Sequence, residues 1–197
     1  MTQDRLPTAI IIGSSRQGRL GDKVGAWAAE TARAFGRFSV DVIDVAALDL
    51  PMNHPAIPTE GILDLQRRID RAAAFVVVTP EYNHSFPGSL KHAIDQACEQ
   101  WWAKPVAFVS YGGQSGGLRA VEALRLVFAE LQAVTIRDGV AFASAWETFA
   151  DEPNEPEPRT SRAAAVMYGH LAWWATVLMR GRAELSLKNF LARRADG

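Results

Sequence analysis

Three glycine-containing segments carry the residue types most suited to binding a ligand. They lie at residues 13–19, 80–88 and 111–117 and read GSSRQGR, PEYNHSFPG and YGGQSGG. Each segment follows a short apolar run and precedes a run with helical periodicity. In a parallel sheet such segments lie at the carboxyl ends of strands, where ligands bind beside the point at which strand order reverses. They therefore indicate a site for a ligand the size of a nucleotide.

The first segment has the composition of an anion site. Gly13 and Gly18 free the backbone, and Ser14, Ser15 and Arg16 add hydrogen-bond donors directly before a predicted helix. A terminal phosphate fits this donor set best. A glycine-rich turn without a ligand is the alternative for this segment taken alone.

Two common nucleotide motifs do not match the first segment. Ser15 stands where the dinucleotide fingerprint G-x-G-x-x-G has its second glycine, and a side chain there hinders approach to a pyrophosphate. The phosphate loop of nucleoside triphosphatases ends in a lysine and a hydroxyl residue, whereas this chain has Arg19 and Leu20.

The second segment is suited to a planar ring. Pro80 restricts the backbone, and Tyr82 and Asn83 provide an aromatic face and an amide beside a strand. Glu81 and His84 admit an acid–base role, although such loop residues are more often simply solvated. The alternative is a rigid turn whose Tyr82 packs against a neighbour.

The third segment lets a ligand approach backbone N–H groups, because Gly112 and Gly113 follow Tyr111 directly. Residues 113–117 also match the G-x-S-x-G pattern of serine hydrolases, with Ser115 as the nucleophile.

A hydrolase with this nucleophile would need Asp138 or Asp151 as its acid and His170 as its base. We regard this as the weaker interpretation, because His170 falls within an apolar helix and no His-Gly-Gly oxyanion loop is visible.

Composition indicates one domain over residues 1–197 in which 48% of residues are hydrophobic and 22% are charged. The 21 basic and 22 acidic side chains nearly cancel, so we expect no nucleic-acid and no membrane partner. No leader-like start or spanning apolar run is visible, so the expected location is cytoplasmic. Cys98 is the only cysteine, and the histidines lack metal spacing, so we expect no metal site.

Short β-rich runs alternate with longer runs of helical period, a pattern typical of βα units around a parallel sheet. We predict strands at 9–12, 38–43, 75–78, 105–110 and within 134–142. We predict helices from an N-cap at Asp22 to Gly36, near 62–72, from a cap at Ser89 to Trp101, at 117–131, and from Thr160 or Ser161 to about Arg180. Residues 146–158 are predicted to form an exposed loop, and Asp41 and Asp44 to cap one.

Five βα units predict an α/β fold, a doubly wound parallel sheet of the flavodoxin-like order 2-1-3-4-5 with helices on both faces. In that order the segments after strands one, three and four gather beside the switch point. These are the three unusual segments, so topology and site support each other.

Three blocks of this chain resemble the NAD(P)H-dependent FMN reductases, a family that includes quinone, azo-dye and chromate reductases. The blocks lie at 13–16, 79–95 and 116–119. The middle one, TPEYNHSFPGSLKHAID, is the most specific. Many members have serine and asparagine where this chain has Arg19 and Gly21, so the details of phosphate contact are expected to differ.

The resemblance implies FMN as the cofactor. It implies that the first segment holds the phosphate, the second lines one side of the isoalloxazine ring, and the third lines its polar edge. The residues expected to contact FMN are Ser14, Arg16, Gly18, Arg19, Leu20, Pro80, Glu81, Tyr82, Asn83, Tyr111, Gly112, Gly113 and Ser115.

The resemblance also implies a ping-pong reaction in which NAD(P)H reduces FMN and a small-molecule electron acceptor then reoxidises it. No side chain need act as acid, base or nucleophile, so we name no catalytic residue. Family members are commonly homodimers or homotetramers. A non-enzymatic electron carrier of the flavodoxin type is the alternative, although this chain lacks the strong acidic excess of such carriers.

Overall fold

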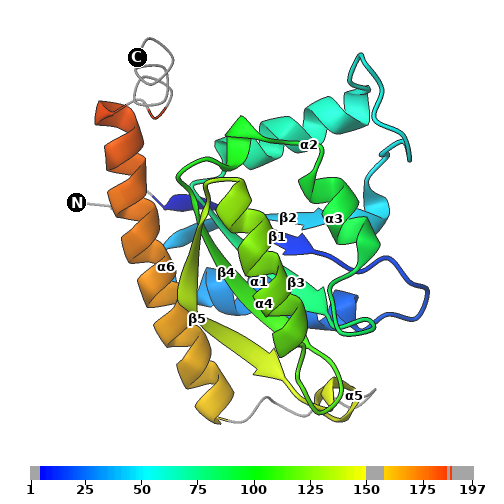
Figure 1. The fold of residues 1–197 in the computed structure, drawn as a ribbon. Coiled ribbons are helices and arrows are strands. Elements are labelled where there is room, and N and C mark those ends of the chain that lie inside the picture. Colours follow the sequence, from blue (N-terminus) through cyan, green and yellow to red (C-terminus); the bar gives the residue numbers. More distant parts are fainter. Residues whose placement is uncertain (1–4, 150–157, 186, 188–197) are drawn as a thin grey trace.

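The computed structural model describes residues 5–149, 158–185 and 187, which form a five-stranded parallel sheet with helices on both faces (Figure 1). The strands are β1 (Leu6–Ile12), β2 (Phe38–Asp44), β3 (Ala74–Pro80), β4 (Pro105–Tyr111) and β5 (Val134–Phe142). Their order is β2-β1-β3-β4-β5, which confirms the predicted flavodoxin-like topology.

Burial explains why the strands were recognisable in the sequence. All residues of the central strands β3 and β4 are buried, as expected for runs covered on both faces. The edge strands are less buried: β5 alternates buried with more exposed positions after Thr135, and most positions of β2 are only partly buried. Strand β1 begins earlier than predicted, because Leu6 already pairs in register with Phe38.

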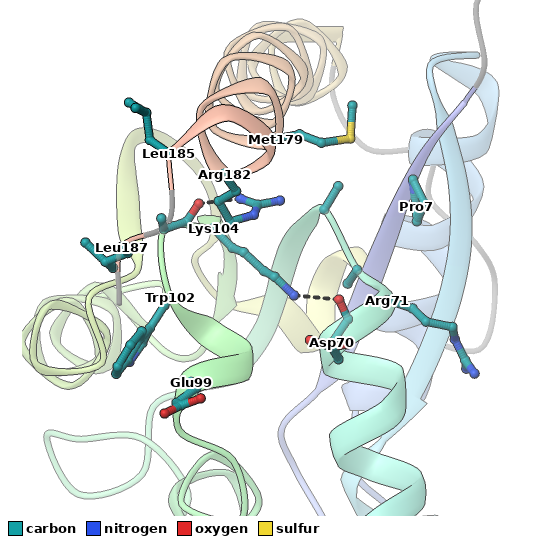
Figure 2. A pocket seen from close by; sticks show the side chains of 13 residues that line it. Pro7, Asp70, Arg71, Glu99, Trp102, Lys104, Met179, Arg182, Leu185 and Leu187 are labelled. Atoms are coloured by element: carbon teal, nitrogen blue, oxygen red, sulfur yellow. Dashed lines mark hydrogen bonds between the residues drawn. The ribbon is translucent and has the colours of Figure 1, made fainter. Parts of the chain in front are cut away.

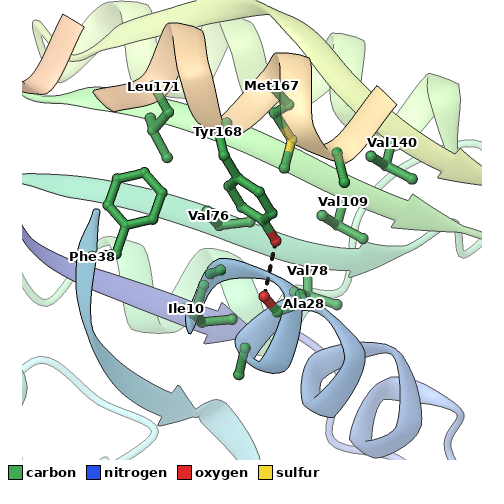
Figure 3. Close-up of a cluster of buried hydrophobic side chains, with 14 of the residues drawn as sticks. Ile10, Ala28, Phe38, Val76, Val78, Val109, Val140, Met167, Tyr168 and Leu171 are labelled. Atoms are coloured by element: carbon green, nitrogen blue, oxygen red, sulfur yellow. Dashed lines mark hydrogen bonds between the residues drawn. The ribbon is translucent and has the colours of Figure 1, made fainter. Parts of the chain in front are cut away.

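The helices form two layers. They are α1 (Gly21–Ala34), α2 (Glu60–Arg71), α3 (Gly88–Ile94), α4 (Leu118–Glu130), α5 (Ala145–Thr148) and α6 (Pro158–Glu184), with single 3₁₀ turns at Val45–Ala47 and Glu99–Trp101. Helices α1 and α6 share one apolar core with the sheet, while α2, α3 and α4 share the other. Figure 3 shows the first core, where the Tyr168 hydroxyl donates to the Ala28 carbonyl at 2.9 Å.

Two predicted helix starts were wrong. Helix α1 begins at Gly21 after Leu20, so Asp22 lies inside the first turn and is not the N-cap. Helix α3 begins at Gly88 after Pro87, and Ser89 does not cap it. The Ser89 hydroxyl instead donates to the Gly13 carbonyl at 3.2 Å and ties α3 to the first segment.

Helix α3 also ends earlier than predicted. It stops at Ile94, and a separate 3₁₀ turn leads to Trp101. The buried indole of Trp101 donates to the Ile94 carbonyl at 3.2 Å, so a side chain satisfies an acceptor at the helix end.

The chain after β5 differs from the predicted loop. Trp146 lies in the short helix α5, and α6 already begins at Pro158. The middle of the predicted loop, residues 150–157, lies outside the described residues. Within the described ranges, no helix combines the length and apolar character that crossing a bilayer requires.

Candidate functional site

The three unusual segments lie side by side at the carboxyl ends of β1, β3 and β4, which are adjacent in the sheet. Backbone hydrogen bonds join them there. Gly13 donates to the Val78 carbonyl at 2.9 Å, and Glu81 donates to the Tyr111 carbonyl at 3.1 Å. The topology therefore brings the three predicted segments to one edge, as the sequence indicated.

The segment between β1 and α1 offers a row of backbone donors. Within the described part of the chain, no acceptor pairs with the N–H groups of residues 14–19. Leu20, the residue before α1, makes no side-chain capping hydrogen bond, so the first N–H groups of this helix lack a cap as well. N–H groups without an acceptor at a helix N-terminus suit an anion.

Arg16 bridges the first two segments. Its side chain is exposed, and its guanidinium carbon lies 3.6 Å from the centroid of the Tyr82 ring. This is a close cation–π contact. It places the Arg16 charge over the Tyr82 ring and thereby links the first segment to the second.

Arg19 has a different environment, because its guanidinium is largely buried and paired with carboxylates. It donates to both oxygens of Asp44, at 2.8 and 2.5 Å, and lies 2.5 Å from a carboxylate oxygen of Asp22. It also donates to the Ser14 carbonyl. Burial opposes ionisation of Asp44, but hydrogen bonds from Arg19 and Ala46 outweigh it and lower the pKa of this carboxyl group.

Ser14 and Tyr111 form a buried pair beneath the first segment. The Tyr111 hydroxyl donates to the Ser14 hydroxyl oxygen at 3.0 Å, and both side chains are at most 5% exposed. Burial raises the pKa of Tyr111 to about 12, more than the Ser14 contact lowers it. A Cβ at Gly21 would lie 2.1 Å from the Ser14 hydroxyl oxygen, so this pair requires glycine at that position.

A two-residue turn presents the aromatic ring of the second segment. Tyr82 and Ser85 exchange backbone hydrogen bonds of 2.8 and 3.0 Å. Asn83 and His84 between them both have positive φ, 49° and 70°. Positive φ at both central positions characterises the tight type I′ hairpin turn. The turn therefore fixes the position of Tyr82.

The carboxylate of Glu81 joins the second segment to the third. It accepts the Ser115 hydroxyl at 2.8 Å, the Arg119 backbone N–H at 3.2 Å and the Arg119 guanidinium at 2.7 Å. Burial opposes ionisation of Glu81, but the Arg119 and Ser115 hydrogen bonds prevail and lower its pKa. Glu81 is therefore ionised, and its hydrogen bonds connect the second segment to Ser115 and Arg119.

The third segment retains only part of its expected donor set. The Gly112 N–H is already bonded to the Phe142 carbonyl at 3.1 Å. Among the described residues, no acceptor pairs with the N–H groups of residues 113–115. Gly117 ends the segment with a φ of 86°, which L side chains rarely adopt.

Sequence reasoning missed three residues at this edge. Arg119 neutralises Glu81, Asp44 holds Arg19, and the exposed Trp146 comes within 3.8 Å of the position that a Cβ on Gly113 would occupy. Asp44 also accepts the Ala46 N–H at 3.0 Å, so it caps the 3₁₀ turn after β2, as predicted. No pattern in the sequence indicated that Trp146 lies at this site, because residue 146 falls in the predicted exposed loop after the last strand.

The residues of the hydrolase alternative are only partly connected. His170 contacts Asp138 at 2.5 Å, so the proposed acid–base pair exists. However, the Ser115 hydroxyl donates to Glu81, whereas His170 is hydrogen-bonded to Asp138. Asp151, the other acid considered, lies outside the described residues. Among the residues described, no group of three or more candidate ligands could hold a metal ion.

A hollow lies at the amino-terminal end of the sheet, opposite the three segments (Figure 2). Lys104 is buried there and donates to the Ile69 and Asp70 carbonyls at 2.9 and 2.7 Å, at the end of α2. Arg182 donates to the Ala103 carbonyl at 2.5 Å. Because these cations already bind helix-end and strand-end carbonyls, we interpret this hollow as structural.

Comparison with known proteins identifies the family of this chain. Residues 7–147 match the model of the family described as NADPH-dependent FMN reductase. An NAD(P)H-dependent FMN reductase of Schizosaccharomyces pombe is 34% identical over 55% of this chain, and the match spans 58% of that protein. A quinone reductase of Pseudomonas putida is 34% identical over 62% of this chain and 70% of its own length.

A solved structure extends the likeness to the fold. FerB, a flavoenzyme NAD(P)H:(acceptor) oxidoreductase from Paracoccus denitrificans, superposes with a TM-score of 0.72 over 87% of this chain and 97% of its own, at 24% identity. The family match covers the strands and all three segments of the site, residues 13 to 117. The chain therefore belongs to the NADPH-dependent FMN reductase family, whose members are oxidoreductases that work with FMN and NAD(P)H.

Proposed function

We propose that this protein binds FMN at the carboxyl edge of its sheet and uses NAD(P)H to reduce a small acceptor, a quinone or free flavin. The observation that carries the proposal is the donor set of the first segment. In the part of the chain that the structure describes, this segment combines N–H groups that have no acceptor, a helix start without a side-chain cap and the exposed Arg16. This combination matches the needs of a terminal phosphate.

The phosphate would be held by the backbone N–H groups of residues 15–18 together with Arg16. Tyr82 and Asn83, in the tight turn after β3, would line one side of the ring. The remaining predicted contacts, among them Leu20 and Pro80, stay predictions of the same site.

The N–H groups of residues 113–115 would serve the polar edge of the ring. FMN supplies the hydride and electron chemistry when bound. Fixed donors at this edge stabilise the negative charge that reduction places there. The ion pair with Arg119 offsets part of the negative charge of Glu81. Glu81 therefore repels the negative charge of the reduced ring less than a lone carboxylate would.

A kinetic experiment tests the function. Purified protein loaded with FMN should oxidise NADH or NADPH in the presence of a small quinone, and double-reciprocal plots at several quinone concentrations should be parallel, as ping-pong exchange requires. Protein that holds FMN yet fails to oxidise either nicotinamide would indicate an electron carrier instead. Protein that binds no flavin but reacts at Ser115 with a serine-directed probe would indicate a hydrolase.

Two further features stay predictions. A homodimer or homotetramer is expected from the family resemblance, and sedimentation of the FMN-loaded protein measures it. The cytoplasmic location is an expectation from the sequence, and fractionation of cells that express the protein would test it.

A further inference from the structure

Arg19 was expected to contact the phosphate, yet its terminal nitrogens already have as many acceptors as hydrogens. One terminal nitrogen donates to the Ser14 carbonyl and to Asp44, and the other lies 2.5 Å from both Asp44 and Asp22. Each of these nitrogens carries two hydrogens. To reach a phosphate, either nitrogen would therefore have to break a bond it already makes.

The pairing with Asp44 is the contact that such a movement would lose. It is a two-point contact between planar groups, the strongest arrangement for an arginine and a carboxylate. The Arg19 side chain is only 9% exposed and that of Asp44 29%. The partner is also fixed in place, because Asp44 ends β2 and accepts the Ala46 N–H.

The same contacts describe a link between β2 and the first segment. Asp44 belongs to the sheet. Arg19 donates both to Asp44 and to the Ser14 carbonyl, so it connects the sheet to the first segment. The Ser14 side chain is held from below by Tyr111. Hydrogen bonds thus hold both the carbonyl and the hydroxyl of Ser14. We infer that this fixes the backbone at Ser14 and so orients the N–H groups of the residues that follow it.

We propose that Asp44 is a positioning residue for the cofactor phosphate, holding Arg19 as a clasp on the Ser14 carbonyl so that backbone N–H groups and Arg16 bind the phosphate. The inference rests on the proposed function, since it concerns the same FMN site. In this proposal Arg19 holds the backbone of the first segment in place and does not itself bind the phosphate. It also explains why this chain tolerates two carboxylates beside an anion site, because Arg19 neutralises part of their charge.

The two possible tasks of Arg19 predict opposite results for Asp44→Asn. If Arg19 bound the phosphate directly, this change would release the guanidinium and remove a repelling charge, so FMN would bind more tightly. If Arg19 is a clasp, the change loosens the Ser14 carbonyl, and FMN binds more weakly. We expect the FMN dissociation constant to rise about tenfold, the effect of weakening one charge-assisted hydrogen bond.

The experiment measures dissociation constants for FMN and for riboflavin, which lacks the phosphate, by quenching of flavin fluorescence. Asp44→Asn should weaken FMN binding but change riboflavin binding less than about threefold. Asp41→Asn is the matched control, because Asp41 lies on the same strand and pairs with Arg68 in the same two-point manner, at 2.9 and 2.6 Å. This control should leave both constants unchanged.

A second variant keeps the proposal open to refutation if Asp44→Asn folds poorly. Arg19→Lys keeps the positive charge but cannot serve Ser14, Asp44 and Asp22 together. The clasp predicts that it loses FMN affinity as Asp44→Asn does, and unchanged affinity would refute the proposal. Equal or tighter FMN binding by folded Asp44→Asn would refute it too. Failure of the unmodified protein to bind FMN would instead overturn the proposed function.

Discussion

Arg16 and Arg19 are three residues apart, yet the fold gives them different surroundings. Arg16 is exposed and stacks on Tyr82, while Arg19 is paired with Asp44 and Asp22. The sequence indicated that both arginines belong to the site but could not separate them. The separation depends on Asp44, which is 25 residues away from Arg19 in the chain.

Arg16→Ala should weaken FMN binding, because it removes the exposed positive charge beside the phosphate donors. The loss of a charge-assisted hydrogen bond corresponds to about 1.5 to 3 kcal/mol, or roughly a ten- to hundredfold rise in the dissociation constant. Flavin titration measures this. Arg33→Ala, at the far end of α1, serves as the control and should bind FMN normally. Mutant protein that remains fully yellow through purification would contradict the role of Arg16.

At the scale of elements, the cores of all five strands were predictable, whereas the start of α1 and both ends of α3 were not. Uniform apolar runs identify buried strands such as β3, because burial on both faces leaves no room for polar residues. The predicted start of α1 was wrong because aspartate, the residue at position 22, is strongly preferred at N-cap positions. The actual first residue, Gly21, lies against a contact between distant residues, the Ser14 and Tyr111 pair, which leaves no room for a Cβ there.

Two glycine substitutions should therefore act in opposite directions. In Gly21→Ala the new methyl group meets the Ser14 hydroxyl, and we expect a loss of about 1 to 3 kcal/mol of unfolding free energy. In Gly169→Ala, within α6, the methyl group meets no atom within 4 Å, and helix propensity should add about 0.5 to 1 kcal/mol. Urea unfolding measures both. A Gly21→Ala protein as stable as the parent would show that the pair does not constrain the start of α1.

At the scale of the whole molecule, the two ends of the sheet differ in the residues that they hold. The carboxyl end carries the candidate site, and the other end holds buried Lys104, whose ammonium donates to the end of α2 (Figure 2). The topology, and with it the meeting of the three segments at the carboxyl end, was predictable from the alternation of strands and loops. Lys104 was not, because a single lysine in a sequence gives no sign of burial.

Lys104 should make stability depend on alkaline pH. Burial lowers its pKa from 10.5 to about 8, with Arg182 adding to the shift and Asp70 opposing it. Between pH 8 and 10 the unfolded chain therefore binds more protons at this residue than the folded one, so its contribution to stability rises with pH. Above pH 10 the raised pKa of Tyr111 and Tyr168, each about 12, acts in the opposite direction.

Urea unfolding at several pH values between 7.5 and 10 tests this expectation. The free energy of unfolding of the parent, minus that of Lys104→Met, should grow with pH by up to about 3 kcal/mol. The subtraction removes the titration of groups common to both proteins. A difference that stays constant over this range would mean that Lys104 titrates normally in the folded protein.

A crystal structure of the FMN-loaded protein tests the central claim most directly. The account predicts the phosphate within hydrogen-bonding distance of the N–H groups of residues 15–18, the ring between Tyr82 and the N–H groups of residues 113–115, and Arg19 still paired with Asp44. FMN bound elsewhere, or no bound FMN in crystals grown at saturating concentration, would contradict it.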